Sequence, residues 1–295
     1  MTAERVFGTD DRIPITDTTV APWRTIAQLV IFDQRNEIVS TCSGVMLNTN
    51  VVLTAAHCLF DPRSQSYVYS LLVVPGENGP TFPFDAAVAR QFAIPQGWVN
   101  SGDIRFDFGL AFITGSPFPP ALGPFLPVAA VPDAYFYDPG TIIATAGYPG
   151  DKLPGTQWFT AGFFFFVDDE AIYTEMDAFP GQSGSPIYTW NDARDELFIV
   201  GVFSSESQRS NYAVRFTASH INALVQYCAS FGCTIQTKQL AGNQSPAPTA
   251  TRAWTPTPTP PVPSTQTPPP TESPTAAPSP TTASRVVVPL VASDR

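Results

Sequence analysis

A serine between two glycines is the strongest chemical signal in the sequence. It lies in the run Gly181-Gln182-Ser183-Gly184-Ser185-Pro186. A nucleophilic serine needs an exposed hydroxyl on a tight turn, and it needs backbone N–H groups that face a developing oxyanion; glycine permits that backbone path. A Gly-x-Ser-Gly string alone is a weak motif, and the alternative is an ordinary loop. The nucleophile elbow of other hydrolases has the different spacing Gly-x-Ser-x-Gly within a strand–turn–helix frame.

A base for this serine must come from one of two histidines, because the chain has no others. His57 follows a predicted buried strand at 51–54 and precedes Cys58. His220 lies among polar neighbours in a predicted helix, so we expect it to be a surface or capping residue. A lone histidine is more often structural than catalytic, but a serine nucleophile needs an adjacent base. His57 is therefore the predicted base.

An aspartate opens the apolar run Asp107-Phe108-Gly109-Leu110-Ala111. A buried carboxylate is costly unless it is paired, and the imidazole N–H of His57 is a suitable donor. Asp103 is the rival carboxylate, but it lies in a more polar stretch. We predict that Asp107 orients His57.

The order histidine, aspartate, serine is typical of the chymotrypsin group. The runs Thr54-Ala55-Ala56-His57-Cys58, 107–111 and 181–186 resemble the trypsin/chymotrypsin-like serine proteases, and within them the bacterial glutamyl-endopeptidase (V8-like) branch. Asp11-Arg12 followed by Asp17-Thr18-Thr19, and the run 146–152, add to a resemblance that covers roughly residues 5–232.

The resemblance implies a serine endopeptidase that works through a Ser-His-Asp triad and an acyl-enzyme. Ser183 would be the nucleophile, His57 its base and Asp107 the orienting residue, with the backbone N–H groups of Gly181 and Ser183 as the oxyanion hole. Neutral Gln182 stands where animal enzymes of the family have an aspartate, so activation must differ; cleavage after Arg5 is one hypothesis. The alternative function is a catalytically silent relative that acts as an extracellular binding module.

The resemblance also places a substrate pocket, which we expect to be lined by Asp177, Phe203, Ser204 and Glu206. Glutamyl endopeptidases use a histidine of the pocket wall to bind the substrate carboxylate, and Phe203 stands at that place here. An acidic pocket would repel a substrate glutamate. We therefore do not expect glutamate specificity, although Asp177 and Glu206 could instead point to solvent.

Short apolar or alternating runs separated by turn residues predict an all-β fold. The predicted strands are 26–32, 51–54, 71–74, 108–113, 141–146, 159–167 and 197–203. One helix is predicted at 218–229, where apolar residues recur at helical spacing. The resemblance implies a double six-stranded β-barrel with this helix at its C-terminal end and the active site between the barrels.

Four cysteines allow three pairings. The resemblance implies a Cys42–Cys58 disulfide, which leaves Cys228 and Cys233 to each other. Disulfides indicate an oxidising compartment, so we expect a secreted or cell-surface protein, although residues 1–5 do not read as a signal peptide.

The formal charge of −10 argues against nucleic acid as a partner. We expect protein or peptide substrates, no metal or other cofactor, no membrane span and a monomer. We expect a protease domain at 1–240, a disordered Pro/Thr/Ser-rich linker at 241–285 and a short apolar segment at 286–295, because the linker cannot bury enough apolar surface to fold.

Overall fold

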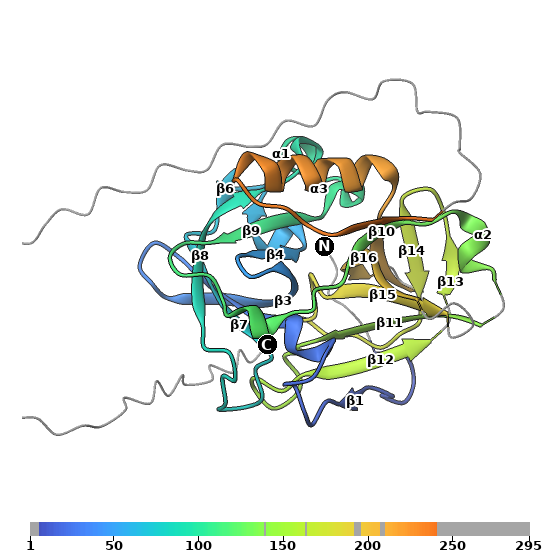
Figure 1. The fold of residues 1–295 in the computed structure, drawn as a ribbon, viewed down its shortest axis with the longest axis horizontal. Coiled ribbons are helices and arrows are strands. Elements are labelled where there is room, and N and C mark those ends of the chain that lie inside the picture. Colours follow the sequence, from blue (N-terminus) through green and yellow to red (C-terminus); the bar gives the residue numbers. More distant parts are fainter. Residues whose placement is uncertain (1–5, 139, 163, 192–195, 207–209, 241–295) are drawn as a thin grey trace, which may run out of the picture. The chain divides into compact units, whose positions relative to one another are not determined.

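Two large β-sheets lie side by side in the computed structural model (Figure 1). The structure describes residues 6–240 except 139, 163, 192–195 and 207–209. The predicted linker 241–285 and the segment 286–295 lie outside the described residues. The all-β fold class is confirmed, because helices are few and short.

The first sheet is a closed antiparallel barrel in the order β2-β3-β4-β9-β8-β7. Its side chains that face inward, such as Leu29, Val45, Leu53 and Val73, are fully buried. This burial is the physical reason for the alternating apolar pattern of the strands. The six strands are β2 (Ile26–Phe32), β3 (Ile38–Asn48), β4 (Val51–Thr54), β7 (Ser70–Pro75), β8 (Ala87–Ala93) and β9 (Gly109–Ile113), and the small β5 (Phe60–Asp61) and β6 (Ser66–Tyr67) pair beside them.

The second sheet follows the order β1-β12-β11-β15-β16-β17-β14-β13, and β10 joins β16 to β18. Strands β12 and β13 lie far apart in this order, yet only residue 163 separates them in sequence. The sheet is thus a curled half-barrel rather than the closed second barrel expected from the resemblance. Its strands are β1 (Ile13–Pro14), β10 (Val128–Ala130), β11 (Thr141–Gly147), β12 (Trp158–Gly162), β13 (Phe164–Val167), β14 (Ala171–Thr174), β15 (Pro186–Asn191), β16 (Glu196–Glu206), β17 (Asn211–Arg215) and β18 (Thr237–Gln239).

The predicted C-terminal helix is α3 (Ala218–Ser230), and it packs on the first barrel. Phe231, at its end, stacks on Phe112 of β9 with ring centroids 3.9 Å apart. His220 forms the capping box of α3 with Thr217 and is buried, so the predicted capping role is confirmed and the surface placement is wrong. The remaining helical elements are α1 (Gln96–Ser101), α2 (Asp133–Phe136) and the 3-10 turns η1 (Trp23–Thr25), η2 (Ala56–Cys58), η3 (Ile104–Phe106) and η4 (Pro120–Leu122).

A segment near each end of the described chain packs on the sheet that is not its neighbour in sequence, and β18 then returns to the second sheet. The N-terminal strand β1 pairs with β12 of the second sheet, while α3, which follows β17, lies over the first barrel (Figure 1). The Cys42–Cys58 disulfide ties β3 to η2, and the Cys228–Cys233 disulfide ties α3 to the loop after it, which confirms both pairings. None of the helices in the described part of the chain is long and apolar enough to cross a membrane.

Candidate active site

His57 and Asp107 lie side by side because the strands that carry them pair. His57 lies in η2 just after β4, Asp107 immediately follows η3 and precedes β9, and Thr54 of β4 pairs with Gly109 of β9. The Asp107 carboxylate accepts the His57 backbone N–H at 2.8 Å through Oδ1, and His57 Nδ1 lies 2.7 Å from Oδ2. A carboxylate only accepts hydrogen bonds, so Nδ1 carries the proton and Nε2 is the basic nitrogen.

A third donor holds the same carboxylate. Ser204 of β16, one of the residues predicted to line the substrate pocket, donates its hydroxyl to Asp107 Oδ2 at 2.5 Å. Asp107 is fully buried, and these three bonds offset the cost of burying its charge. The rival carboxylate, Asp103, instead caps η3 and forms an ion pair with Arg105.

The glycines that flank Ser183 occupy positions that a larger residue could not. Gly181 has φ +106°, and a Cβ there would lie 2.6 Å from the Tyr148 carbonyl oxygen. Gly184 has φ +83°, and its Cβ would lie 2.1 Å from Thr54 Oγ1. Both the backbone conformation and the packing therefore require glycine.

The Ser183 loop is anchored beside the histidine. The backbone N–H of Ser43 donates to the Ser183 carbonyl at 2.8 Å, and the Ser43 hydroxyl donates to the Gly181 carbonyl at 2.8 Å. The Ser183 carbonyl oxygen lies 3.8 Å from Cys58 Sγ, and a ring nitrogen of His57 lies within 4.8 Å of that sulfur. The loop and the imidazole thus share one small region between the sheets.

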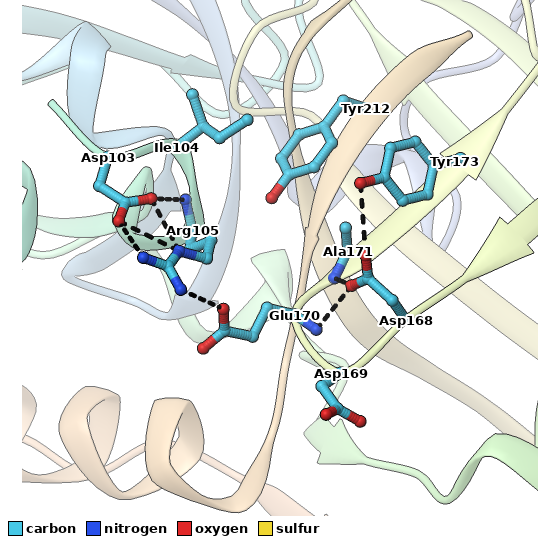
Figure 2. A pocket seen from close by; sticks show the side chains of 9 residues that line it. All are labelled: Asp103, Ile104, Arg105, Asp168, Asp169, Glu170, Ala171, Tyr173 and Tyr212. Atoms are coloured by element: carbon cyan, nitrogen blue, oxygen red, sulfur yellow. Dashed lines mark hydrogen bonds and ion pairs between the residues drawn. The ribbon is translucent and has the colours of Figure 1, made fainter. Parts of the chain in front are cut away.

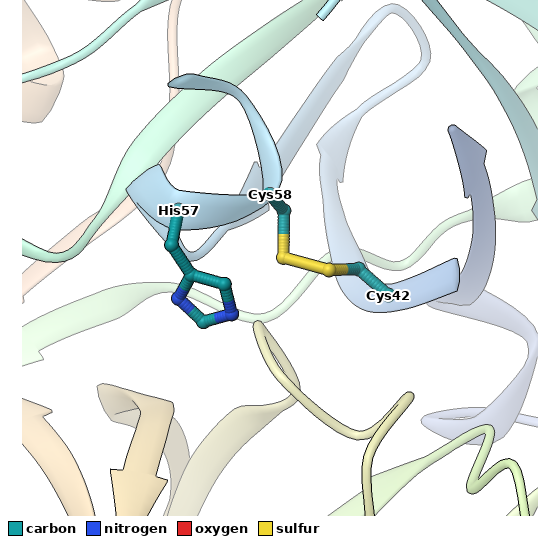
Figure 3. Close-up of side chains that lie close together, drawn as sticks. All are labelled: Cys42, His57 and Cys58. Carbon is teal, nitrogen blue, oxygen red and sulfur yellow. A yellow bond between two sulfur atoms is a disulfide. The ribbon is translucent and has the colours of Figure 1, made fainter. Parts of the chain in front are cut away.

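Cys42, His57 and Cys58 gather three atoms of the kinds that bind metals. Figure 3 shows that the two sulfurs are joined in a disulfide and that the imidazole lies beside it. Zinc binds cysteine as the thiolate, and a disulfide sulfur is not one. The disulfide thus braces the turn that carries His57.

This arrangement agrees with the family comparison. Residues 17–224 match the sequence profile of the trypsin family. The chain belongs to the trypsin family. The resemblance inferred from the sequence motifs is thereby confirmed.

Several relatives of this trypsin-family chain are bacterial proteases. It is 33% identical over 193 residues to the glutamyl endopeptidase of Bacillus licheniformis, an alignment that covers 64% of this chain and 56% of that protein. It is 27% identical over 226 residues to an extracellular metalloprotease of Bacillus subtilis, covering 76% of this chain and 70% of the relative. A solved Glu endopeptidase structure matches it with a TM-score of 0.64 at 28% identity, covering 76% of this chain and 99% of that one.

The predicted pocket residues have different surroundings in the structure. Asp177 is buried and accepts the backbone N–H groups of Phe7 at 2.6 Å and Asp11 at 3.0 Å. Phe203 is fully buried in β16. Glu206 pairs with Asn211 at the end of the same strand.

A cavity of about 520 Å³ lies near the Asp107 end of the site. Figure 2 shows its walls, which come from the η3 region, from the turn between β13 and β14, and from β17. Tyr212 of β17, which lines the cavity, pairs in the sheet with Ser205, the neighbour of Ser204. The cavity is acidic, because four carboxylates and one guanidinium line it. The carboxylates are those of Asp103, Asp168, Asp169 and Glu170, and the guanidinium is that of Arg105.

Two contacts of this trypsin-family site could not be predicted from the sequence. One is the bond from Ser204 to Asp107, and the other is a buried arginine, Arg12, that reaches Gln182. Arg12 was noted only as part of a motif. The one available signal was that Arg12 directly follows two aspartates, Asp10 and Asp11, and this run does not identify a partner 170 residues away.

Proposed function

We propose that this chain is a secreted serine endopeptidase that cleaves proteins or peptides through an acyl-enzyme. The observation that carries the proposal is the contact of His57 Nδ1 with the buried Asp107 carboxylate at 2.7 Å, beside the glycine-flanked Ser183. That contact sets the imidazole tautomer that a serine nucleophile requires.

In this proposal Ser183 Oγ attacks the carbonyl carbon of the scissile bond and its proton passes to His57 Nε2. The backbone N–H groups of Gly181 and Ser183 stabilise the oxyanion of the tetrahedral intermediate. When the intermediate collapses, the C–N bond breaks and the leaving amine takes the proton from His57. Water then attacks the acyl-enzyme by the same route, and the acid product leaves with Ser183 restored.

Two features argue that the substrate residue before the scissile bond is not glutamate. Phe203, which cannot ionise, stands where glutamyl endopeptidases are expected to have a carboxylate-binding histidine. Asp177 adds negative charge to the same region, although two backbone N–H groups already occupy its oxygens. We therefore do not extend the glutamate specificity in the relatives' names to this chain.

Secretion is supported by the two disulfides, which persist in oxidising compartments. It is also supported by the Bacillus subtilis relative, whose name describes an extracellular protein. The silent binding module is the less favoured alternative, because such relatives usually lose a triad residue and all three are present here.

Labelling with a fluorophosphonate tests the proposal, because the reagent reacts only with an activated serine. We expect the wild-type chain to be labelled and to cleave peptides, and we expect Ser183→Ala to do neither. Ser185→Ala is the matched control, since it changes the neighbouring serine of the same loop and should keep labelling at Ser183. A folded wild-type chain that is neither labelled nor active would favour the silent module.

A further inference from the structure

A segment near the N-terminus, residues 7–12, supports the loop that carries the nucleophile. Asp177, six residues before Ser183, is buried, and its two carboxylate oxygens accept the backbone N–H groups of Phe7 and Asp11. The Asp11 carboxyl in turn accepts the hydroxyl of Thr160 on β12 at 3.3 Å. The segment is therefore fastened both to the second sheet and to the loop.

Arg12 makes the most extensive contact of this segment. Its side chain is fully buried, and all five of its N–H donors have acceptors. Nε and Nη2 donate to the Asp10 carboxylate at 2.9 and 2.8 Å. Nη1 and Nη2 donate to the Asp151 carboxylate at 3.0 and 2.5 Å. The fifth N–H, from Nη1, reaches Gln182 Oε1 at 3.2 Å.

The charges around Arg12 balance. Lys152 Nζ lies 2.5 Å from Asp10, so two cations face the two carboxylates of Asp10 and Asp151. Burial acts to lower the pKa of Arg12, but the bonds from Asp10 and Asp151 outweigh it and raise that pKa. Arg12 thus stays protonated, and a neutral side chain, Gln182, can occupy its last donor without leaving a buried charge unpaired.

Gln182 links Arg12 to the backbone of the loop through hydrogen bonds. Its Oε1 also accepts the Phe179 N–H at 3.1 Å, and its own N–H donates to the Phe179 carbonyl at 3.0 Å. Its carbonyl accepts the Ser185 N–H at 2.9 Å. Gln182 therefore closes the turn that contains Gly181 and Ser183, the two residues whose N–H groups form the proposed oxyanion hole.

We propose that Arg12 is a positioning residue, which holds Gln182 and through it keeps the oxyanion turn in its working conformation. This inference rests on the proposed function. It accounts for the neutral residue at position 182, because the cation that orders this loop is an internal guanidinium and a carboxylate is not needed as its partner. Arg12 itself does not touch the substrate.

The test compares Arg12→Ala with Arg63→Ala in the full chain. Arg63 is a matched control, because its side chain is 90% exposed and lies in the turn between β5 and β6. Losing one oxyanion donor lowers kcat by about 10²–10³-fold, so we expect Arg12→Ala to lower kcat about 100-fold with KM within about threefold. Arg63→Ala should leave both constants unchanged.

Two readouts separate positioning from a general loss of folding. Guanidinium ions at non-denaturing concentration should restore at least about tenfold of the lost kcat in Arg12→Ala and nothing in Arg63→Ala. Arg12→Lys should recover only part of the activity, because an ammonium has three donors in place of five. A loss of kcat that matches the loss of folded protein by circular dichroism, with no response to guanidinium, would overturn the inference.

Gln182→Met decides the matter if Arg12→Ala does not fold. Methionine keeps the length of the side chain and leaves the four bonds of Arg12 to Asp10 and Asp151 in place. We expect kcat to fall about 30-fold or more in folded Gln182→Met. Wild-type turnover by this variant would overturn the role of Arg12 alone, whereas a folded wild-type chain without activity or labelling would overturn the proposed function and this inference with it.

Discussion

At the scale of the residue, Asp107 is the best-determined member of the candidate triad. It is fully buried and receives three donors, the His57 backbone N–H, His57 Nδ1 and the Ser204 hydroxyl. Because each donor comes from a different direction, the carboxylate cannot turn without breaking at least one bond. The backbone of η2 and the Ser204 hydroxyl of β16 thus fix the carboxylate, which in turn fixes the orientation of the imidazole.

Replacement of Asp107 by asparagine tests this orientation. The amide has nearly the same shape, but it offers an N–H group where the carboxylate accepts one, which favours the wrong tautomer of His57. We expect kcat to fall about 10⁴-fold at neutral pH, the size of effect known for this substitution in the triad mechanism. Steady-state hydrolysis of a peptide ester measures it.

Asp103→Asn is the matched control for this change. Asp103 is four residues away and pairs with Arg105 at the partly exposed η3 turn, so its replacement should alter kcat less than about threefold. An equal loss in both variants would contradict the assignment of Asp107, and so would an Asp107→Asn enzyme within about tenfold of the wild type.

At the scale of the element, α3 carries a histidine that makes stability depend on pH. Burial lowers the pKa of His220 from 6.5 to about 4, and bonds to backbone groups of Arg105 and Arg215 oppose this shift only in part. Its Nδ1 accepts the Thr217 N–H at 3.0 Å, a bond that protonation would abolish. The proton therefore binds the unfolded chain more tightly than the folded one.

The sign of the pH effect follows from this difference. The stabilisation is complete above about pH 6.5 and is lost as the pH falls through about 4, by about 3 kcal/mol of unfolding free energy. Denaturant unfolding at pH 7, 5.5 and 4 measures it. His220→Gln keeps a capping-box acceptor but does not titrate, so the stability difference between wild type and variant should change by this amount. Parallel pH profiles would contradict the prediction.

The elements differ in how far the sequence predicts them. Strands β2 and β4 and helix α3 were predicted within a residue or two, because each places apolar side chains on a buried face at the proper period. Strand β3 was missed, since Ser40, Thr41 and Ser43 interrupt its apolar pattern. Strands β15 and β17 were missed as well. Both are short, and β17 begins with the buried Asn211, whose side-chain amide donates to the Met176 carbonyl at 2.8 Å, a partner that the local pattern does not reveal.

The candidate site divides in the same way. The triad was expected from local motifs, because His57, Asp107 and Ser183 each stand in a distinctive run of residues. Ser204 and Arg12 could not be assigned, because their roles depend on hydrogen bonds to residues about 100 or more positions away. Local sequence motifs therefore identify the residues expected to react, whereas the residues that hold them in place can be identified only from the tertiary fold.

At the scale of the whole molecule, a segment near each end of the described chain supports the candidate site. Residues 7–12 reach the nucleophile loop from one side, and α3 covers the first barrel, whose Phe108 packs against His220 with ring centroids 5.0 Å apart. Phe108 is the neighbour of Asp107 in sequence. Each half of the candidate triad is thus supported by a segment that lies far from it in sequence.

The charge of the molecule leads to a prediction about its substrates. The net charge of −10 attracts cationic peptides, and four carboxylates line the cavity whose wall includes η3, the turn before Asp107. For matched peptides flanked by lysine or by glutamate, we expect kcat/KM to favour the lysine peptide about tenfold at low salt. The ratio should approach one in about 0.5 M salt, where surface charges are screened over a few ångströms.

Asp169→Asn, in the cavity wall, should reduce the ratio more than Asp85→Asn, an equal charge change at an exposed site of the first barrel. Equal effects would assign the preference to net charge alone, and no preference at low salt would contradict the prediction.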